Sequence, residues 1–263
     1  MKRRALQIAA VRYLNTEPLL VGLRGRPEVR LRLCKPARCA ELLRRGGVDL
    51  SLVPVAALAG RGEYRIVPHL AIGARGPVRS VVLFSRVPPA RIRRLALDTS
   101  SRTSVVLARL WLRRRWGIDP RPIRHRPDLK AMLRRADAAL LIGDYALASR
   151  GVAPYEVDLG NAWWQLERLP FVFAVWAGRD TARARSAARL VAASAATGLR
   201  RKADVARAWA ESRGGDPTLV LRYLRRHVRY QLGPMELRGL RRFLDLAAAE
   251  RLLPPTGPLR FLR

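Results

Sequence analysis

The sequence contains little cysteine, histidine, lysine or acid. Its 263 residues include two cysteines, three histidines and 20 Asp and Glu, against 52 Lys and Arg that are nearly all arginine. Two cysteines cannot build a disulfide framework, and Cys34 and Cys39 lack the second ligand pair of a zinc site, so we expect free thiols in a reducing cytoplasm. His69, His125 and His227 lie far apart in the sequence, and we assign none of them a catalytic role.

Long apolar runs and the common catalytic signatures are also absent. No stretch approaches the roughly 18 apolar residues of a transmembrane helix, so we expect no membrane partner. Residues 1–4 resemble the start of a signal peptide, but Arg12 interrupts the apolar run that follows, and residues 5–11 are interpreted as a buried strand. The sequence has no P-loop, GxGxxG, HExxH or GxSxG motif, and no cluster of metal-ligating residues. We therefore expect no metal site.

The net charge of +32 raises the question of a nucleic-acid partner. The arginines are dispersed along the chain, with only short clusters at residues 113–115, 200–202 and 222–229. Nucleic-acid binders concentrate their charge in a patch or arm and interleave aromatic residues for stacking, whereas only 6% of this chain is aromatic. We expect a solvated, arginine-rich surface and no nucleic-acid partner. A nucleic-acid-binding regulator stays open as an alternative that rests on charge alone.

Short apolar runs alternate with amphipathic stretches over the first two-thirds of the chain, which predicts an α/β protein with mainly parallel sheets. We expect strands at residues 5–11, 29–33, 48–53, 64–72, 80–85, 94–97, 122–124, 138–142 and 171–177. Helices are expected from about residue 18 and at 39–45, 55–59, 103–116 and 129–135. The last third is predicted to be helical, with helices near residues 181–212, 217–230 and 235–251.

This order of elements predicts two lobes joined by crossing strands. The natural crossing points are Gly76–Pro77 and Ala177–Gly178. They divide the chain into one lobe of residues 1–76 plus 178–263 and a second of residues 77–177, with a cleft between them. The oligomeric state is left open.

Three polar loops follow predicted strands, where ligands bind in open α/β sheets. They span residues 13–18, 98–104 and 142–145. Each loop could merely cap the helix that follows it. The capping residue would be Thr16 in the first loop, Ser100 or Ser101 in the second and Asp144 in the third. The second loop has hydroxyl side chains at five of the six positions 99–104, and one cap needs only one of them. A hydroxyl-rich helix N-terminus suits a carboxylate, so we expect a carboxylate site there.

Several motifs in order resemble the chorismate dehydratases of the futalosine route to menaquinone. The matching segments are Tyr13-Leu14-Asn15 with Pro18-Leu19, Val48-Asp49 with Val53-Pro54, residues 76–81, 97–104 and 138–144, Asp158-Leu159-Gly160 with Trp163 or Trp164, and residues 169–174. The resemblance covers residues 6–178 clearly and the helical tail more loosely. It departs at Glu167-Arg168, where the family usually has a Thr-Gly pair. The cysteine- and histidine-bearing motifs of the sister enzyme, which makes 1,4-dihydroxy-6-naphthoate, are not apparent.

The resemblance implies a two-lobed fold of the periplasmic-binding-protein type II and loss of water from chorismate, a hydro-lyase reaction without a cofactor. It implies catalytic roles for Asn15, through its amide, and for Ser80, as a hydroxyl near the leaving group. The implied substrate-binding residues are Tyr13, Pro54, Ser101, Thr103, Ser104 and Asp144, with Thr103 and Ser104 on a carboxylate. No protein base is obvious, so the enolpyruvyl carboxylate of the substrate is the candidate base. The alternative is a non-catalytic solute-binding protein of the same fold for a small carboxylate.

Overall fold

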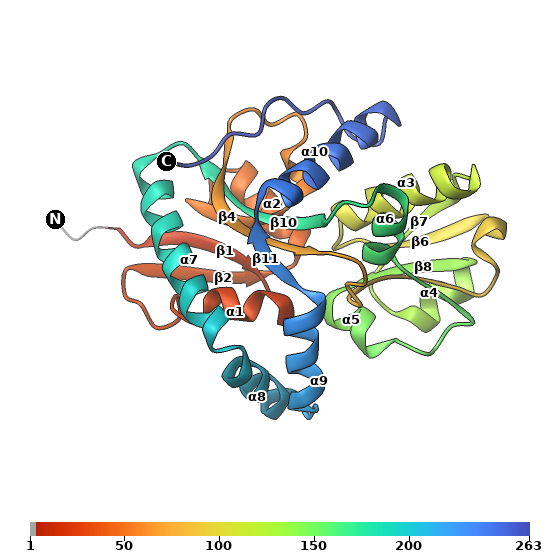
Figure 1. Cartoon of the computed structure of the whole chain (residues 1–263), viewed down its shortest axis with the longest axis horizontal. Helices are drawn as coiled ribbons and strands as arrows, with labels where there is room; N and C mark the ends of the chain where they lie inside the picture. Colours follow the sequence, from red (N-terminus) through yellow and green to blue (C-terminus); the bar gives the residue numbers. More distant parts are fainter. Residues whose placement is uncertain (1–3) are drawn as a thin grey trace.

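Two β-sheets lie side by side in the computed structural model, which describes residues 4–263 (Figure 1). The first sheet has the strand order β11-β4-β10-β3-β1-β2. Its strands are β1 (Leu6–Val11), β2 (Val29–Cys34), β3 (Leu50–Pro54), β4 (Tyr64–Ala74), β10 (Phe171–Arg179) and β11 (Arg229–Leu232). The second sheet has the order β7-β6-β8-β5-β9. Its strands are β5 (Val81–Ser85), β6 (Arg94–Asp98), β7 (Arg121–His125), β8 (Ala138–Ile142) and β9 (Tyr155–Asp158).

The α/β architecture is as predicted, but both sheets are mixed rather than mainly parallel. Among the described strands, four neighbouring pairs are parallel and five are antiparallel. The parallel pairs are those joined through helices, as in β1-α1-β2 and β6-α3-β7, because a parallel pair needs a long crossover connection. Strands β5, β10 and β11 enter their sheets from the other direction. A pattern of alternating elements does not reveal that reversal.

Helices surround each sheet (Figure 1). With the first sheet lie α1 (Glu17–Leu20), α2 (Pro36–Arg44), α7 (Ala182–Arg200), α8 (Lys202–Arg213), α9 (Pro217–Arg222) and α10 (Pro234–Ala249). With the second lie α3 (Thr103–Trp116), α4 (Leu129–Arg135), α5 (Gly143–Ala148) and α6 (Leu159–Glu167). The bounds predicted for α3 and α4 are confirmed. Gly117, which follows α3, takes the left-handed conformation that ends a helix.

The last third departs from the helical prediction in two places. The expected helix at 181–212 breaks at Arg201 into α7 and α8. The expected helix at 217–230 ends early: α9 passes into a π-helical turn, η4 (Tyr223–His227), and then into β11. Burial alternates over residues 228–232, and β11 pairs with the edge of β4, so sheet pairing overrides the helical pattern here. Strand β9 and helix α6 were not predicted.

The chain passes between the sheets in two segments. The first follows β4 and includes Gly76–Pro77, close to the predicted crossing. The second precedes Phe171, because all of β10 is hydrogen-bonded between β3 and β4 of the first sheet. The predicted limit between residues 177 and 178 therefore falls inside a strand of the first sheet. The division into lobes of residues 1–76 plus 178–263 and 77–177 stays a prediction.

Helix α10 ties the helical third to the second sheet. Arg242 of α10 donates to Glu167 at the end of α6 over 2.7 Å, and the rings of Trp163, Phe171 and Phe243 pack edge-on. Arg168, the C-cap of α6, has a φ of 55°, in the left-handed region that favours glycine. A glycine would suit the cap that Arg168 occupies, and the preceding Glu167 forms an ion pair with Arg242.

Candidate active site

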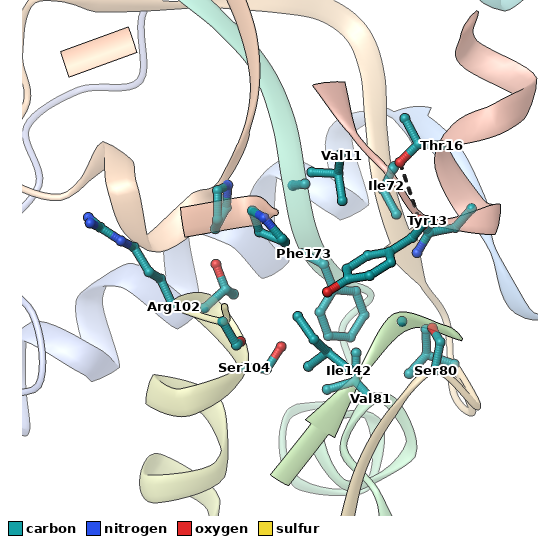
Figure 2. A pocket seen from close by; sticks show the side chains of 18 residues that line it. Val11, Tyr13, Thr16, Ile72, Ser80, Val81, Arg102, Ser104, Ile142 and Phe173 are labelled. Carbon is teal, nitrogen blue, oxygen red and sulfur yellow. Dashed lines mark hydrogen bonds between the residues drawn. The ribbon is translucent and has the colours of Figure 1, made fainter. Parts of the chain in front are cut away.

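A pocket of about 550 Å³, measured out to open solvent, lies where the two sheets meet. Its lining residues are Val11, Tyr13, Asn15, Thr16, Pro36, Pro54, Ile72, Val78, Ser80, Val81, Ser101, Arg102, Thr103, Ser104, Ile142, Gly143, Phe173 and Ala174 (Figure 2). Seven of the eight predicted site residues are among them; Asp144 is beside the pocket, next to Gly143. The wall is mostly apolar, with a few polar groups at its ends, as is usual for a small-molecule site.

Asn15 follows β1 and is held through both its side chain and its backbone. The hydroxyl of Thr16 donates to Asn15 Oδ1 over 3.3 Å, the bond drawn in Figure 2. The hydroxyl of Tyr230 donates to the carbonyl oxygen of Asn15 over 3.0 Å. Thr16 is the N-cap of α1, but its side chain makes no capping bond. Capping therefore does not account for this loop, and the Asn15 side chain, which lines the pocket, also interacts with the hydroxyl of Tyr223.

Ser80 immediately precedes β5 of the second sheet, lines the pocket and is almost completely buried. Its Oγ accepts a hydrogen bond from the hydroxyl of Tyr223 over 2.8 Å. Its carbonyl oxygen accepts from the Gly143 N–H over 2.7 Å. The preceding turn is fixed by Asp158, whose carboxylate accepts from the N–H groups of Val78 and Arg79. The site thus holds Ser80 from its side chain, its carbonyl and its preceding backbone.

The hydroxyl-rich loop leads into the N-terminus of α3. Arg102 is the N-cap of α3 and makes no side-chain cap, and Ser100 bonds to Asp98 instead of capping the helix. The Thr103 hydroxyl oxygen accepts from the Ala56 N–H over 3.1 Å, so part of its capacity is used within the protein. Across residues 4–263, no side-chain hydrogen bond involves the hydroxyls of Ser101 or Ser104. These groups, with the first N–H groups of α3, suit a carboxylate.

Tyr13 lies across the pocket, with its hydroxyl directed toward the α3 end (Figure 2). That hydroxyl is 3.4 Å from Ser100 Oγ, which in turn donates to Asp98 Oδ1 over 2.7 Å. Burial raises the pKa of Tyr13 and, in the same manner, raises the pKa of the carboxyl group of Asp98. Tyr13 therefore enters the pocket as a neutral phenol at the end of a hydrogen-bonded chain.

Asp144 joins the second sheet's side of the pocket to the first loop. Its Oδ1 accepts from the Leu14 N–H over 3.1 Å, and it caps no helix through its side chain. Burial raises the pKa of Asp144 to about 6. Beside it, Gly143 has a φ of 61°, and a Cβ there would lie 2.7 Å from the Tyr13 ring. Asp144 therefore positions the loop that carries Tyr13 and Asn15.

Three side chains that shape the site were not among the predicted site residues. Tyr223 and Tyr230 reach it from the last third of the chain, 143 and 215 residues from their partners. Arg102 also lines the pocket, but its side chain is exposed and extends away from Ser104 (Figure 2). It stands in the matched motif, so that motif could have suggested it; no local pattern points to the tyrosines.

Known structures share this fold. Protein AF1704 from Archaeoglobus fulgidus matches with a TM-score of 0.78 at 17% identity, covering 96% of this chain and 100% of that one. The alkanesulfonate-binding protein SsuA from Xanthomonas axonopodis pv. citri, bound to MOPS, matches with a TM-score of 0.67 at 18% identity, covering 97% and 96%. The fold is that of the periplasmic binding proteins, as predicted.

Sequence comparisons define the family. A family model described as menaquinone biosynthesis matches residues 6–249. A curated chorismate dehydratase from Thermus thermophilus is 33% identical, with 94% of this chain and 95% of that protein covered. The chain belongs to the menaquinone biosynthesis family, which confirms the resemblance drawn from its motifs.

Residues 4–263 also bear on the expected membrane and metal partners. No helix in this range has the length and apolar character needed to cross a membrane. The same range contains no group of three or more His, Cys, Asp or Glu side chains placed to hold a metal ion. The expected lack of a nucleic-acid partner stays a prediction.

Proposed function

We propose that this protein is a chorismate dehydratase, a hydro-lyase that converts chorismate to 3-[(1-carboxyvinyl)oxy]benzoate and water for menaquinone biosynthesis. The observation that carries the proposal is the pocket itself: in a chain of this family, Asn15 and Ser80 both line it, with a hydroxyl-rich helix N-terminus at one end. Chorismate is a dicarboxylate with one hydroxyl that must leave. The pocket offers a carboxylate site, an amide and a buried hydroxyl in one apolar chamber.

The chemistry requires little beyond orientation and anion stabilisation. The hydrogen on the ether-bearing ring carbon is vinylogous to the ring carboxylate, so its removal gives a delocalised anion. Expulsion of the neighbouring hydroxide then makes the ring aromatic, and the proton and hydroxide together form the water released. Preorganised hydrogen-bond donors lower the barrier by stabilising this developing charge.

Each polar wall has a part in this reaction. The Ser101–Ser104 segment with the N-terminus of α3 holds a carboxylate. The Asn15 NH2 group donates to the substrate near the reacting carbons. Ser80 donates to the leaving hydroxyl. Tyr13 and Pro54 shape the wall, and Asp144 contributes by holding the Tyr13 loop through Leu14.

The base is the substrate's own enolpyruvyl carboxylate. Among residues 4–263, the pocket lining contains no Asp, Glu or His side chain. Asp98 Oδ1 accepts from Ser100 while its buried Oδ2 has no partner, and Asp144 Oδ1 accepts from the Leu14 N–H; neither residue lines the pocket. The enolpyruvyl carboxylate lies close to the hydrogen that leaves, so the enzyme needs only to hold it in that position. We place the reaction in the cytoplasm, in keeping with the free thiols of Cys34 and Cys39.

The second candidate is a non-catalytic protein that binds a small carboxylate. It is favoured by the fold, because a sulfonate-binding protein superposes on nearly the whole chain. Purified protein is mixed with chorismate, and the aromatic product is followed by absorbance and identified by mass. Catalytic formation of the aromatic acid supports the dehydratase. Saturable binding without product supports the binding protein and overturns the proposal.

A further inference from the structure

We propose that Tyr223 and Tyr230 are positioning residues that set the two catalytic walls of the pocket, Tyr223 through Ser80 and Tyr230 through Asn15. This inference rests on the dehydratase function proposed above and deepens it. Both tyrosines belong to the short segment 223–230, which runs from the π-helical turn η4 into β11. Irregular turns of this kind are frequent at functional sites.

The Tyr223 bond determines what Ser80 can do. A phenol hydroxyl carries one hydrogen, and that of Tyr223 is donated to Ser80 Oγ over 2.8 Å. Burial raises the pKa of Tyr223, so the phenol stays protonated and remains the donor. With its oxygen accepting from Tyr223, Ser80 has its own hydrogen free to point toward the pocket. The bond therefore fixes Ser80 as a donor to the leaving hydroxyl, and it strengthens as charge moves onto Oγ.

The Tyr230 bond acts on the backbone of Asn15, whose side chain also interacts with the Tyr223 hydroxyl. The Tyr230 hydroxyl donates to the carbonyl oxygen of Asn15 over 3.0 Å, and its own ring is covered by the Lys202 ammonium 4.9 Å away. Burial also raises the pKa of Tyr230, which keeps it a donor. This bond holds the backbone of Asn15, while Thr16 orients its amide. Tyr230 thus fixes the position of Asn15 through its backbone and does not contact the side-chain NH2 group that binds the substrate.

The segment also contacts the first crossing between the sheets. His227 Nδ1 lies 3.1 Å from the carbonyl oxygen of Pro77, three residues before Ser80. One short segment therefore bonds to Asn15 beside the first sheet, to Ser80 beside the second and to the connection between them. A segment with these three attachments fixes the separation of the two catalytic side chains. This gives the helical third of the chain a direct part in the site.

The test is a set of kinetic measurements on Tyr223→Phe, Ser80→Ala and the double variant with chorismate. Losing one hydrogen bond to a group that acts in the transition state corresponds to a fall of about tenfold in kcat. We expect that fall in Tyr223→Phe with KM changed by less than about twofold. In the Ser80→Ala background, Tyr223→Phe should change kcat very little, because the partner atom is gone. A purely structural role would give the same loss in both backgrounds.

Two further variants complete the design. Tyr230→Phe should lower kcat less than Tyr223→Phe, since it acts on a backbone atom. Tyr64→Phe is the matched control, because Tyr64 is a buried tyrosine outside the pocket lining, and it should keep wild-type kinetics. Thermal unfolding is measured for each variant. If Tyr223→Phe does not fold, the inference is tested with Tyr230→Phe, and wild-type kinetics in that folded variant overturn it.

The outcomes separate this inference from the proposed function. Suppose that the wild type is active. If Tyr223→Phe then has wild-type kinetics, or lowers kcat by the same factor with and without Ser80, the positioning role is overturned and the dehydratase function stands. Wild type without turnover of chorismate overturns the proposed function, and this inference falls with it. The predicted non-additive loss supports both.

Discussion

The substitution Asp144→Asn should make the protein more stable at neutral pH, and by an amount that depends on pH. Burial raises the pKa of this carboxyl group from 3.8 to about 6 in the folded protein. The ionised form is therefore disfavoured in the folded state, despite the hydrogen bond from the Leu14 N–H and the nearby Arg213. Asparagine keeps an acceptor oxygen for Leu14 and carries no charge to desolvate, so it resembles the protonated carboxyl group.

The magnitude follows from the shift. A difference of about two pH units between the folded and unfolded states corresponds to about 3 kcal/mol. The folded wild type binds the proton more tightly, so this part of its stability is present at low pH and is lost as the pH rises from about 4 to about 6. The free energy of unfolding of Asp144→Asn should therefore match wild type near pH 4 and exceed it by up to about 3 kcal/mol above pH 6.5.

The assay is urea unfolding followed by tryptophan fluorescence at several pH values between 4 and 8. The matched control is Asp216→Asn, because Asp216 is an exposed N-cap that accepts from the Thr218 N–H over 2.7 Å. This control shows how the loss of one exposed carboxylate changes the free energy of unfolding of this strongly basic protein. A stability difference between wild type and Asp144→Asn that stays constant over the whole pH range would refute the reasoning.

Three further predictions follow from other parts of the molecule. Arg168→Gly should raise the free energy of unfolding by about 0.5–1 kcal/mol in urea melts, because Arg168 occupies a left-handed cap; a loss would contradict this. In the folded protein an alkylating reagent should modify Cys34 and spare Cys39, which mass spectrometry of the labelled protein will show. The hydrogen bond between the two thiols and nearby guanidinium groups lower the pKa of Cys34, whereas that bond and burial raise the pKa of Cys39. Equal labelling of the two cysteines would count against this prediction. Raising the salt concentration should lower kcat/KM for chorismate by about threefold and leave kcat unchanged. Salt screens the attraction between the positively charged protein and the dicarboxylate substrate, which affects capture and not turnover. A fall in kcat would contradict this prediction.

Local signals predicted much of the fold and the polar loops that line the pocket, whereas Ser80 and Pro54 were implied only by the resemblance. Helix α3 was predicted because its apolar spacing, its hydroxyl-rich start and the glycine after its end all lie within one stretch of chain. The same holds for the loops that carry Asn15 and Ser101–Ser104. Their meeting in one pocket follows from the rule that ligands bind beyond the carboxyl ends of strands.

Features that depend on distant partners were not predictable from the sequence. Strand β11 exists because it pairs with the edge of β4, more than 150 residues earlier in the chain. Asp144 could be interpreted as a helix cap until the structure placed it on the Leu14 N–H, 130 residues away. The two tyrosines that hold Ser80 and Asn15 carry no local motif at all. In each case, tertiary contacts determined the outcome.

The central claim is that Asn15 and Ser80 dehydrate chorismate in the pocket between the two sheets. The most direct test is kcat at saturating chorismate for wild type, Asn15→Ala and Ser80→Ala, with the product identified by mass. We predict that wild type forms the aromatic acid and that each variant loses roughly a hundredfold or more in kcat while staying folded. Near-normal turnover in either folded variant would contradict the role given to that residue, and in both it would contradict the account.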